Sequence, residues 1–192
     1  MVFRLDTPYV LIPGSDPKGT FGSIVEMILK SRLRLHLEEC PYSNDEEVNA
    51  YLAGLLVSYI DPQYLQAIHP FLSRYDTDVH QSVVRCGEDR VLPYRIYKAN
   101  ADDLLMSLGI FRRFLSEAES EMVRVRRYYI AASSCQQRIY RHPTAVSEIQ
   151  SRLAGETRRY LAILTETRLN YLSFARQVAP DDWAEFEARL EA

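Results

Sequence analysis

The feature of this sequence that most constrains its fold is a long amphipathic pattern over residues 144–178. Apolar side chains recur there mostly at alternating steps of three and four, which is the spacing of one face of an α-helix. A second apolar stripe beside the first widens this face, which is therefore expected to bury against more than one neighbour. The first stripe is Val146, Ile149, Leu153, Tyr160, Ile163, Tyr171, Phe174 and Val178, and the second is Leu161, Leu164, Leu172 and Ala175.

An unbroken helix over residues 144–178 would be long for this chain. It would span ~52 Å at ~1.5 Å per residue, whereas a compact chain of 192 residues has a diameter of roughly 42 Å. The overhanging apolar end would need a partner. We therefore predict self-association through the C-terminal helices, as a homodimer with Leu164 and Leu172 on the contact surface. In the alternative interpretation, Gly155 breaks the helix and the whole chain folds into one bundle.

Helix signals also mark most of the remaining chain. They comprise the capping-box pattern of Ser23 and Glu26, acidic residues after Asn44, Asp61 followed by a proline, and Asn100 before a run of leucines. Residues 117–141 form a further amphipathic segment, and Pro180 opens a short last helix. We predict an all-α fold, a helical bundle of about seven helices with a long C-terminal helix. It forms a single helical domain over residues 1–192, with an N-terminal extended segment 1–22 and a C-terminal long-helix region 117–192.

Residues 75–99 have the weakest helical pattern and are predicted to form a small extended or hairpin insert. The segments 79–85 and 90–97 flank a turn-like stretch that contains Gly87. Pro93 would restrict the second segment to the edge of a sheet. A packed irregular loop is the alternative.

Charge is distributed unevenly along the chain. The apolar fraction of 47% and the charged fraction of 26% are those of an ordinary globular protein, and the net charge of −3 argues against generic nucleic-acid binding. Residues 112–176, however, carry twelve basic and six acidic side chains, and residues 177–192 carry one arginine and five acids. The basic block is expected to attract an acidic group, for which the C-terminal stretch is one candidate.

The arginines of residues 117–141 provide the candidate interaction surface. Arg124, Arg127, Arg138 and Arg141 fall within one sector of the helix, opposite an apolar sector. Because arginine makes planar, bidentate contacts with carboxylate and phosphate, an acidic protein, a nucleotide or a nucleic acid could dock there. Alternatively the face is solvated, or it is neutralised internally by the acids of residues 45–47 or 185–191.

Other motifs provide weaker signals. The loop of residues 14–20 has two glycines spaced as in a phosphate-binding loop, but Lys18 precedes the second glycine instead of following it, so a connecting turn is predicted. His36 and Cys40, and Cys135 and His142, have spacings that could supply zinc ligands, but nothing resembles a zinc finger. We predict no catalytic residue, no metal site and no cofactor, and a non-enzymatic function is favoured over catalysis, which stays open as an alternative.

The sequence also bears on location and source. It has three cysteines, an odd number, and opens without the pattern of a signal peptide, so free thiols and a cytoplasmic location are expected. The excess of arginine over lysine is typical of GC-rich coding and favours a bacterial source.

Together these patterns predict a non-enzymatic helical interaction protein. It would be an adaptor or subunit of a cytoplasmic assembly, associating through its C-terminal helices and presenting the arginines to a protein partner with an acidic surface, with no role for a membrane. Two alternatives remain open: a nucleic-acid-binding accessory factor that uses the same arginines, and a small anionic-ligand-binding protein with a pocket between helices.

Overall fold

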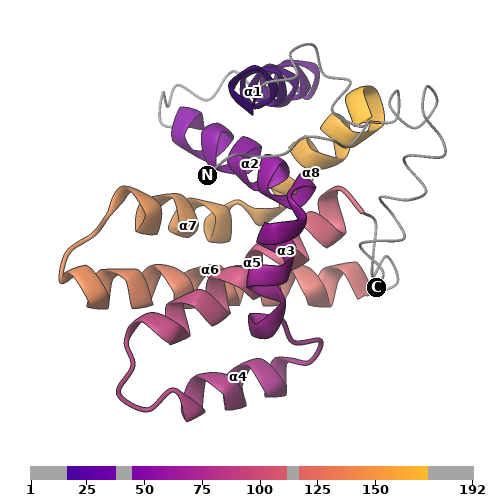
Figure 1. Cartoon of the computed structure of the whole chain (residues 1–192). Helices are drawn as coiled ribbons and strands as arrows, with labels where there is room; N and C mark the ends of the chain where they lie inside the picture. Colours follow the sequence, from indigo (N-terminus) through magenta and orange to yellow (C-terminus); the bar gives the residue numbers. More distant parts are fainter. Residues whose placement is uncertain (1–16, 38–44, 112–116, 173–192) are drawn as a thin grey trace. The chain divides into compact units, whose positions relative to one another are not determined.

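The computed structural model describes residues 17–37, 45–111 and 117–172. These residues form eight α-helices, with short 3-10 and π segments and no strand, which confirms the predicted all-α fold (Figure 1). No described helix is long and apolar enough to cross a membrane. The helices are α1 (Pro17–Arg34), α2 (Asp45–Ile60), α3 (Pro62–Ile68), α4 (Asp76–Arg85), α5 (Val91–Gly109), α6 (Ala118–Tyr140), α7 (Ala145–Gly155) and α8 (Thr157–Thr167), with a 3-10 turn at His69–Phe71 and a π segment at Arg168–Leu172.

The chain divides into two compact units. Unit 1 comprises residues up to 65 together with residues from 163 onward, and unit 2 comprises residues 66–162. Unit 1 thus contains α1 and α2, and unit 2 contains α4 to α7. The single domain of residues 1–192 stays a prediction.

In unit 1, α1 packs against α2. Three acidic residues open α2, where the positive end of the helix dipole stabilises them, as the sequence predicts. The helical spacing along α2 also places its apolar residues as expected, with Val48, Leu52, Leu55, Leu56 and Tyr59 buried. Ile24 and Ile28 of α1 are buried as well.

Polar contacts join the helices of unit 1. The Arg32 guanidinium is buried, and it donates to Asn49 Oδ1 at 3.1 Å and to the carboxylate of Asp45. On another side of α1, Thr167 Oγ1 donates to Ser31 Oγ at 2.9 Å. Because each of these groups is satisfied, the desolvation cost of burying them is offset.

In unit 2, α5 packs on α6, α6 packs on α7, and α4 packs on α5. The buried apolar side chains recur at helical spacing on α6 and α7, whereas on α5 they include the consecutive residues 104–106, since α5 packs against both α4 and α6. They include Ile96, Leu104, Leu105 and Met106 of α5, Val125, Tyr128, Tyr129 and Ala132 of α6, and Ile149 and Leu153 of α7. The observed bounds of α6 agree with the amphipathic segment predicted at residues 117–141.

The predicted start of α3 is confirmed in detail. Asp61 precedes the helix, and its Oδ1 accepts a hydrogen bond from the Gln63 amide at 2.9 Å. Pro62 occupies the first helical position, where its missing N–H costs no hydrogen bond.

The extended or hairpin insert predicted for residues 75–99 is wrong. The segment forms α4 and the first half of α5, with a turn between them. Gly87 supplies the left-handed conformation after the end of α4, with φ of 57°. Asp89 then caps α5, because its Oδ1 accepts from the amides of Val91 and Leu92 at 2.8 and 3.0 Å. Pro93 lies in the first turn of α5, where proline is tolerated.

Asn100 therefore lies inside α5, although its sequence context predicts a helix start there. It is buried, and its Nδ2 donates to the Phe71 carbonyl at 2.7 Å and to the Ile96 carbonyl at 2.8 Å. Its Oδ1 accepts from the Ser73 amide at 2.9 Å. The side chain thus fixes the segment before α4 against α5.

The predicted N-terminal extended segment is also wrong for its described part. Pro17 begins α1, and Ser23 and Glu26, which form a capping-box pattern in the sequence, lie inside this helix. Proline at the first helical position explains the earlier start. The predicted strand at residues 9–12, Cys40 and the last helix after Pro180 lie outside the described residues.

The long helix predicted over residues 144–178 is interrupted, so this prediction is wrong. α7 ends at Gly155, Glu156 leaves the helical conformation with φ of −118° and ψ of 33°, and α8 starts at Thr157. Thr157 Oγ1 donates to the carbonyls of Leu153 at 2.8 Å and Ala154 at 3.1 Å. In a continuous helix the amides of residues 157 and 158 would bond these carbonyls. The hydroxyl replaces these amides, which opens the hydrogen-bond ladder at this point.

Arg141 ends α6 in the left-handed conformation, with φ of 61°. A side chain with a Cβ is strained there, whereas glycine is not. We expect Arg141→Gly to raise the free energy of unfolding by about 1 kcal/mol, measured by urea denaturation. Arg141→Ala, which removes the charge but keeps the Cβ, is the control and should not stabilise. Equal effects of the two variants would contradict this explanation.

Candidate anion-binding cleft

The first arginine of the predicted face of α6 has partners within unit 2. Arg124 is engaged: its Nη1 donates to both carboxylate oxygens of Glu121 at 2.9 Å, and its Nη2 donates to the Arg74 carbonyl at 3.0 Å. Its side chain is only 15% exposed. Arg124 therefore holds local structure in unit 2 and offers little to a partner.

Arg127 pairs with Asp76 at the start of α4. Asp76 Oδ1 also accepts a hydrogen bond from the Tyr128 hydroxyl at 2.7 Å. Burial raises the pKa of Asp76, but the Tyr128 hydrogen bond and the Arg127 charge outweigh this effect and lower it below its usual value. The internal neutralisation anticipated for this face is thus observed for Arg124 and Arg127, but the acids that provide it are Glu121 and Asp76.

The Tyr128 hydroxyl is expected to lose its proton only at unusually high pH. Burial, and then the hydrogen bond to Asp76, raise the pKa of its hydroxyl from 10.0 to about 12. Because the folded pKa is the higher one, this contribution to stability is complete below pH 10.0 and is lost as the pH rises through about 12. Tyrosinate absorbance should show one more late-titrating phenol in the wild type than in Tyr128→Phe. Superimposable titration curves would contradict the assignment.

The two remaining arginines of the predicted face lie near the C-terminal end of α6. Arg138 is exposed, and its Nε makes a long 3.4 Å contact with the Ser134 carbonyl. It borders a hollow of about 890 Å³ that also contains Arg90, Glu88 and Asp89. Because the acids of this hollow offset its arginines, it has no clear preference for an anion. Arg141 is exposed.

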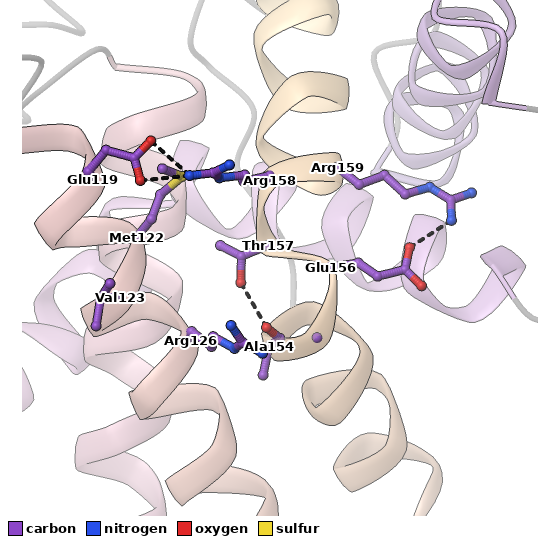
Figure 2. A pocket seen from close by; sticks show the side chains of 10 residues that line it. Glu119, Met122, Val123, Arg126, Ala154, Glu156, Thr157, Arg158 and Arg159 are labelled. Carbon is purple, nitrogen blue, oxygen red and sulfur yellow. Dashed lines mark hydrogen bonds and ion pairs between the residues drawn. The ribbon is translucent and has the colours of Figure 1, made fainter.

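A second hollow lies where α6 passes the junction of α7 and α8 (Figure 2). This cleft has a volume of about 510 Å³. One wall comes from α6, and the other comes from the residues around the helix break. Its lining residues are Glu119, Met122, Val123, Arg126, Ala154, Gly155, Glu156, Thr157, Arg158 and Arg159.

Two of the three arginines of the cleft have acidic neighbours. Arg158 Nη2 donates to both carboxylate oxygens of Glu119, at 2.9 and 3.0 Å. Arg159 reaches away from the cleft toward Glu156, and their side chains meet at 2.7 Å (Figure 2). The Arg158–Glu119 pair is exposed, with side chains 77% and 75% accessible. An exposed pair of this kind contributes little to stability, so another carboxylate can replace Glu119 at small cost.

Arg126 is the cation of the cleft without an acidic partner among the described residues. It is exposed on α6, and Figure 2 shows it beside Ala154 at the end of α7. The sequence-based sector omits this residue, which lies between Arg124 and Arg127 in the sequence but about 100° from Arg127 around the helix. Its free guanidinium can make bidentate hydrogen bonds with a carboxylate or phosphate.

The helix break adds a positive partial charge to the same cleft. The first amides of a helix have no intrahelical acceptor, and the aligned peptide dipoles leave about half a unit charge at its N-terminus. The first two residues of α8, Thr157 and Arg158, line the cleft. The three arginines of the cleft exceed its two glutamates by one charge, and the α8 N-terminus adds to this excess, so the cleft favours an anion.

Of the two leucines predicted on the contact surface, Leu164 has a described side chain and Leu172 does not. Leu164 is fully buried, so its assignment to an interaction surface is wrong. Leu172 ends the π segment, and its side chain lies outside the described residues.

The weaker motifs acquire no site in the part of the chain that the structure describes. Residues 17–20 of the glycine-containing loop belong to α1, which corrects the predicted turn for that part. Cys135 is buried, and burial raises the pKa of its thiol, so it is not an activated nucleophile. Within residues 17–37, 45–111 and 117–172, no group of three or more histidine, cysteine or acidic side chains could hold a metal ion.

No family model, no curated protein and no solved structure matches this chain. The class of protein is thus defined by the fold alone, an all-α helical chain with a cationic cleft in unit 2.

Proposed function

We propose that this protein is a non-enzymatic helical interaction protein, an adaptor or subunit of a cytoplasmic assembly, that binds an acidic protein partner at the cleft of unit 2. The observation that carries the proposal is Arg126, an exposed guanidinium without an acidic partner among the described residues. Arg158 and the N-terminus of α8 border the same cleft. Two arginines and a helix N-terminus favour carboxylate groups.

Self-association through the C-terminal helices is not part of this proposal. It depended on a continuous, overhanging helix over residues 144–178, and that helix ends at Gly155. The docking surface also shifts along α6 and onto α8, from the sequence-predicted arginines to Arg126 and Arg158.

The test is the binding of a fluorescent glutamate-rich peptide to the full chain, followed by anisotropy at low and at physiological salt. The double variant Arg126→Glu/Arg158→Glu should weaken binding at least about tenfold, because two attractive charges become repulsive. The matched control Arg85→Glu/Arg95→Glu reverses two exposed arginines of α4 and α5 and should bind like the wild type. Equal losses in both variants would show a general charge effect and reject the cleft.

Nucleic acid and small anions are tested in the same experiment. A duplex DNA that binds more tightly than the peptide, with an affinity that falls steeply with salt, would replace the protein partner by nucleic acid. A small anionic ligand is the second candidate, because a cavity of about 510 Å³ lies within the usual range for such ligands. Thermal stabilisation by citrate or phosphate that disappears in Arg126→Glu would favour it.

A further inference from the structure

We propose that the acidic partner binds as an amphipathic α-helix that lies along the outer face of α6. This face is defined by Val123, Arg126, Arg127 and Ile130. The inference rests on the proposed function, and it specifies the form of the partner that the cleft would accept.

The apolar part of this face is a pair of exposed side chains at helical spacing. Val123 is 55% exposed and Ile130 is 52% exposed. They are seven residues apart, which is nearly two turns, so they lie on one line along α6, ~10 Å apart. The buried residues Val125 and Tyr129 of the same helix point to the opposite side, into the core. Val123 and Ile130 thus contribute nothing to the core of unit 2 and are free to contact a partner.

The charged part of the face flanks this line on both sides. At about 100° per residue, Arg126 and Arg127 lie on opposite sides of the line through Val123 and Ile130. Arg126 is on the side of the cleft and has no acidic partner among the described residues. Arg127 is on the other side, and its pair with Asp76 leaves its side chain 55% exposed. A partner should therefore present an apolar line with acids on either side.

An α-helix meets this requirement better than an extended peptide. Apolar residues seven apart on a partner helix repeat at the same ~10 Å as Val123 and Ile130. Acids three or four positions from those residues flank them on the helix surface, where they would face the arginines. One of these carboxylates would enter the cleft, where Arg126 and Arg158 are its ligands.

Polar residues at both ends of this face limit the length of the apolar contact. Toward the start of α6, the apolar line ends at the exposed ion pair of Glu119 and Arg158. Toward its other end, Ser134 and Gln137 continue the line with polar side chains. The apolar contact therefore covers about two turns of a partner helix.

The probe for this inference is a fluorescent 18-residue peptide with two leucines seven apart, glutamates three and four positions from each, and alanine elsewhere. A control peptide has the same composition, but one leucine is moved to the opposite side of the helix. The full chain should bind the first peptide at least about tenfold more tightly than the second, and circular dichroism should show that the bound peptide gains helix. Equal affinities, or binding without a gain of helix, would overturn the inference.

Variants of the protein test the same contact from its other side. Val123→Ser/Ile130→Ser should weaken binding of the first peptide about tenfold and leave that of the control peptide unchanged. Val84→Ser/Val91→Ser is the matched control, since these valines of α4 and α5 are 67% and 44% exposed. No loss in the first variant, or equal loss in both, would overturn the inference.

The outcomes separate this inference from the proposed function. If binding depends on Arg126 and Arg158 but not on Val123 and Ile130, the acidic partner stands and its helical form is wrong. If neither peptide binds, both proposals fail. If anionic lipid vesicles bind through Val123 and Ile130 while the peptides do not, the face is a membrane contact and both proposals are again overturned.

Discussion

Replacing Lys98 by Met is expected to lower the free energy of unfolding by about 3 kcal/mol. The Lys98 ammonium donates to Asp102 Oδ2 at 2.5 Å, and the Tyr129 hydroxyl donates to Asp102 Oδ1 at 2.8 Å. The Asp102 side chain is 0% exposed, whereas that of Lys98 is 29% exposed. The variant therefore leaves a fully buried carboxylate without this cation, which costs more than the loss of an exposed ion pair.

The double variant Lys98→Met/Asp102→Asn separates charge from packing. It removes both charges of the pair and keeps an acceptor for the Tyr129 hydroxyl, so most of the lost stability should return. Urea denaturation measures all three proteins. A single variant within about 0.5 kcal/mol of the wild type, or a double variant as unstable as the single one, would show that the buried charge is not the cause.

Replacing Arg32 by Leu should destabilise the chain by about 2–3 kcal/mol. The guanidinium joins α1 to α2, since it bonds Asn49 and Asp45, and its side chain is 11% exposed. Its removal deprives the Asp45 carboxylate, 17% exposed, of this cation in a partly dry environment. The cost is smaller than for Lys98 because Asp45 remains in the first turn of α2, where the helix dipole stabilises it.

Lys30→Leu is the matched control for this prediction. It removes a cation from the same helix, but the Lys30–Glu26 pair is exposed, with side chains 53% and 64% accessible. We expect a change within about 0.5 kcal/mol. Hydrogen exchange should show that Arg32→Leu, unlike Lys30→Leu, increases exchange of the α1 amides. Similar effects of the two variants would contradict a special role for the buried guanidinium.

Local signals in the sequence predicted a large part of the fold. α2 has acids in its first turn and a continuous apolar face, α3 follows Asp61 and Pro62, and α6 is amphipathic over its whole length. In each case the signal lies in the residues that form the helix. Tertiary contacts were not needed to specify these elements.

The predictions for residues 75–99 and 144–178 were wrong because a residue in each segment is compatible with two conformations. Pro93 fits the edge of a sheet and also the first turn of a helix, and the cap that Asp89 provides decides for the helix. Gly155 indicates a weak point in the helix over residues 144–178, but its intrinsic cost of ~1 kcal/mol does not break a helix. The hydroxyl of Thr157 completes the break by donating to two carbonyls of α7. No sequence pattern predicts these hydrogen bonds.

The candidate site was predicted only in part. The sequence singled out α6 as a basic helix, but the chosen sector included Arg124 and Arg127, which Glu121 and Asp76 engage. Arg126 and Arg158 were missed, because whether an arginine is available to a partner depends on which acids other helices bring near it. One signal was present: Arg126 lies beside the line of Val123 and Ile130, two apolar residues outside the buried sector.

The order in which the chain is synthesised has a consequence for its two units. Unit 2 is one continuous stretch, residues 66–162, whereas unit 1 needs residues from both sides of that stretch. The hydrogen bond between Ser31 and Thr167 joins residues 136 positions apart. All of unit 2 is therefore synthesised before residues 163–167 of α8, which unit 1 needs for this contact. Contacts between residues far apart in the sequence form slowly, so unit 1 is expected to be completed last.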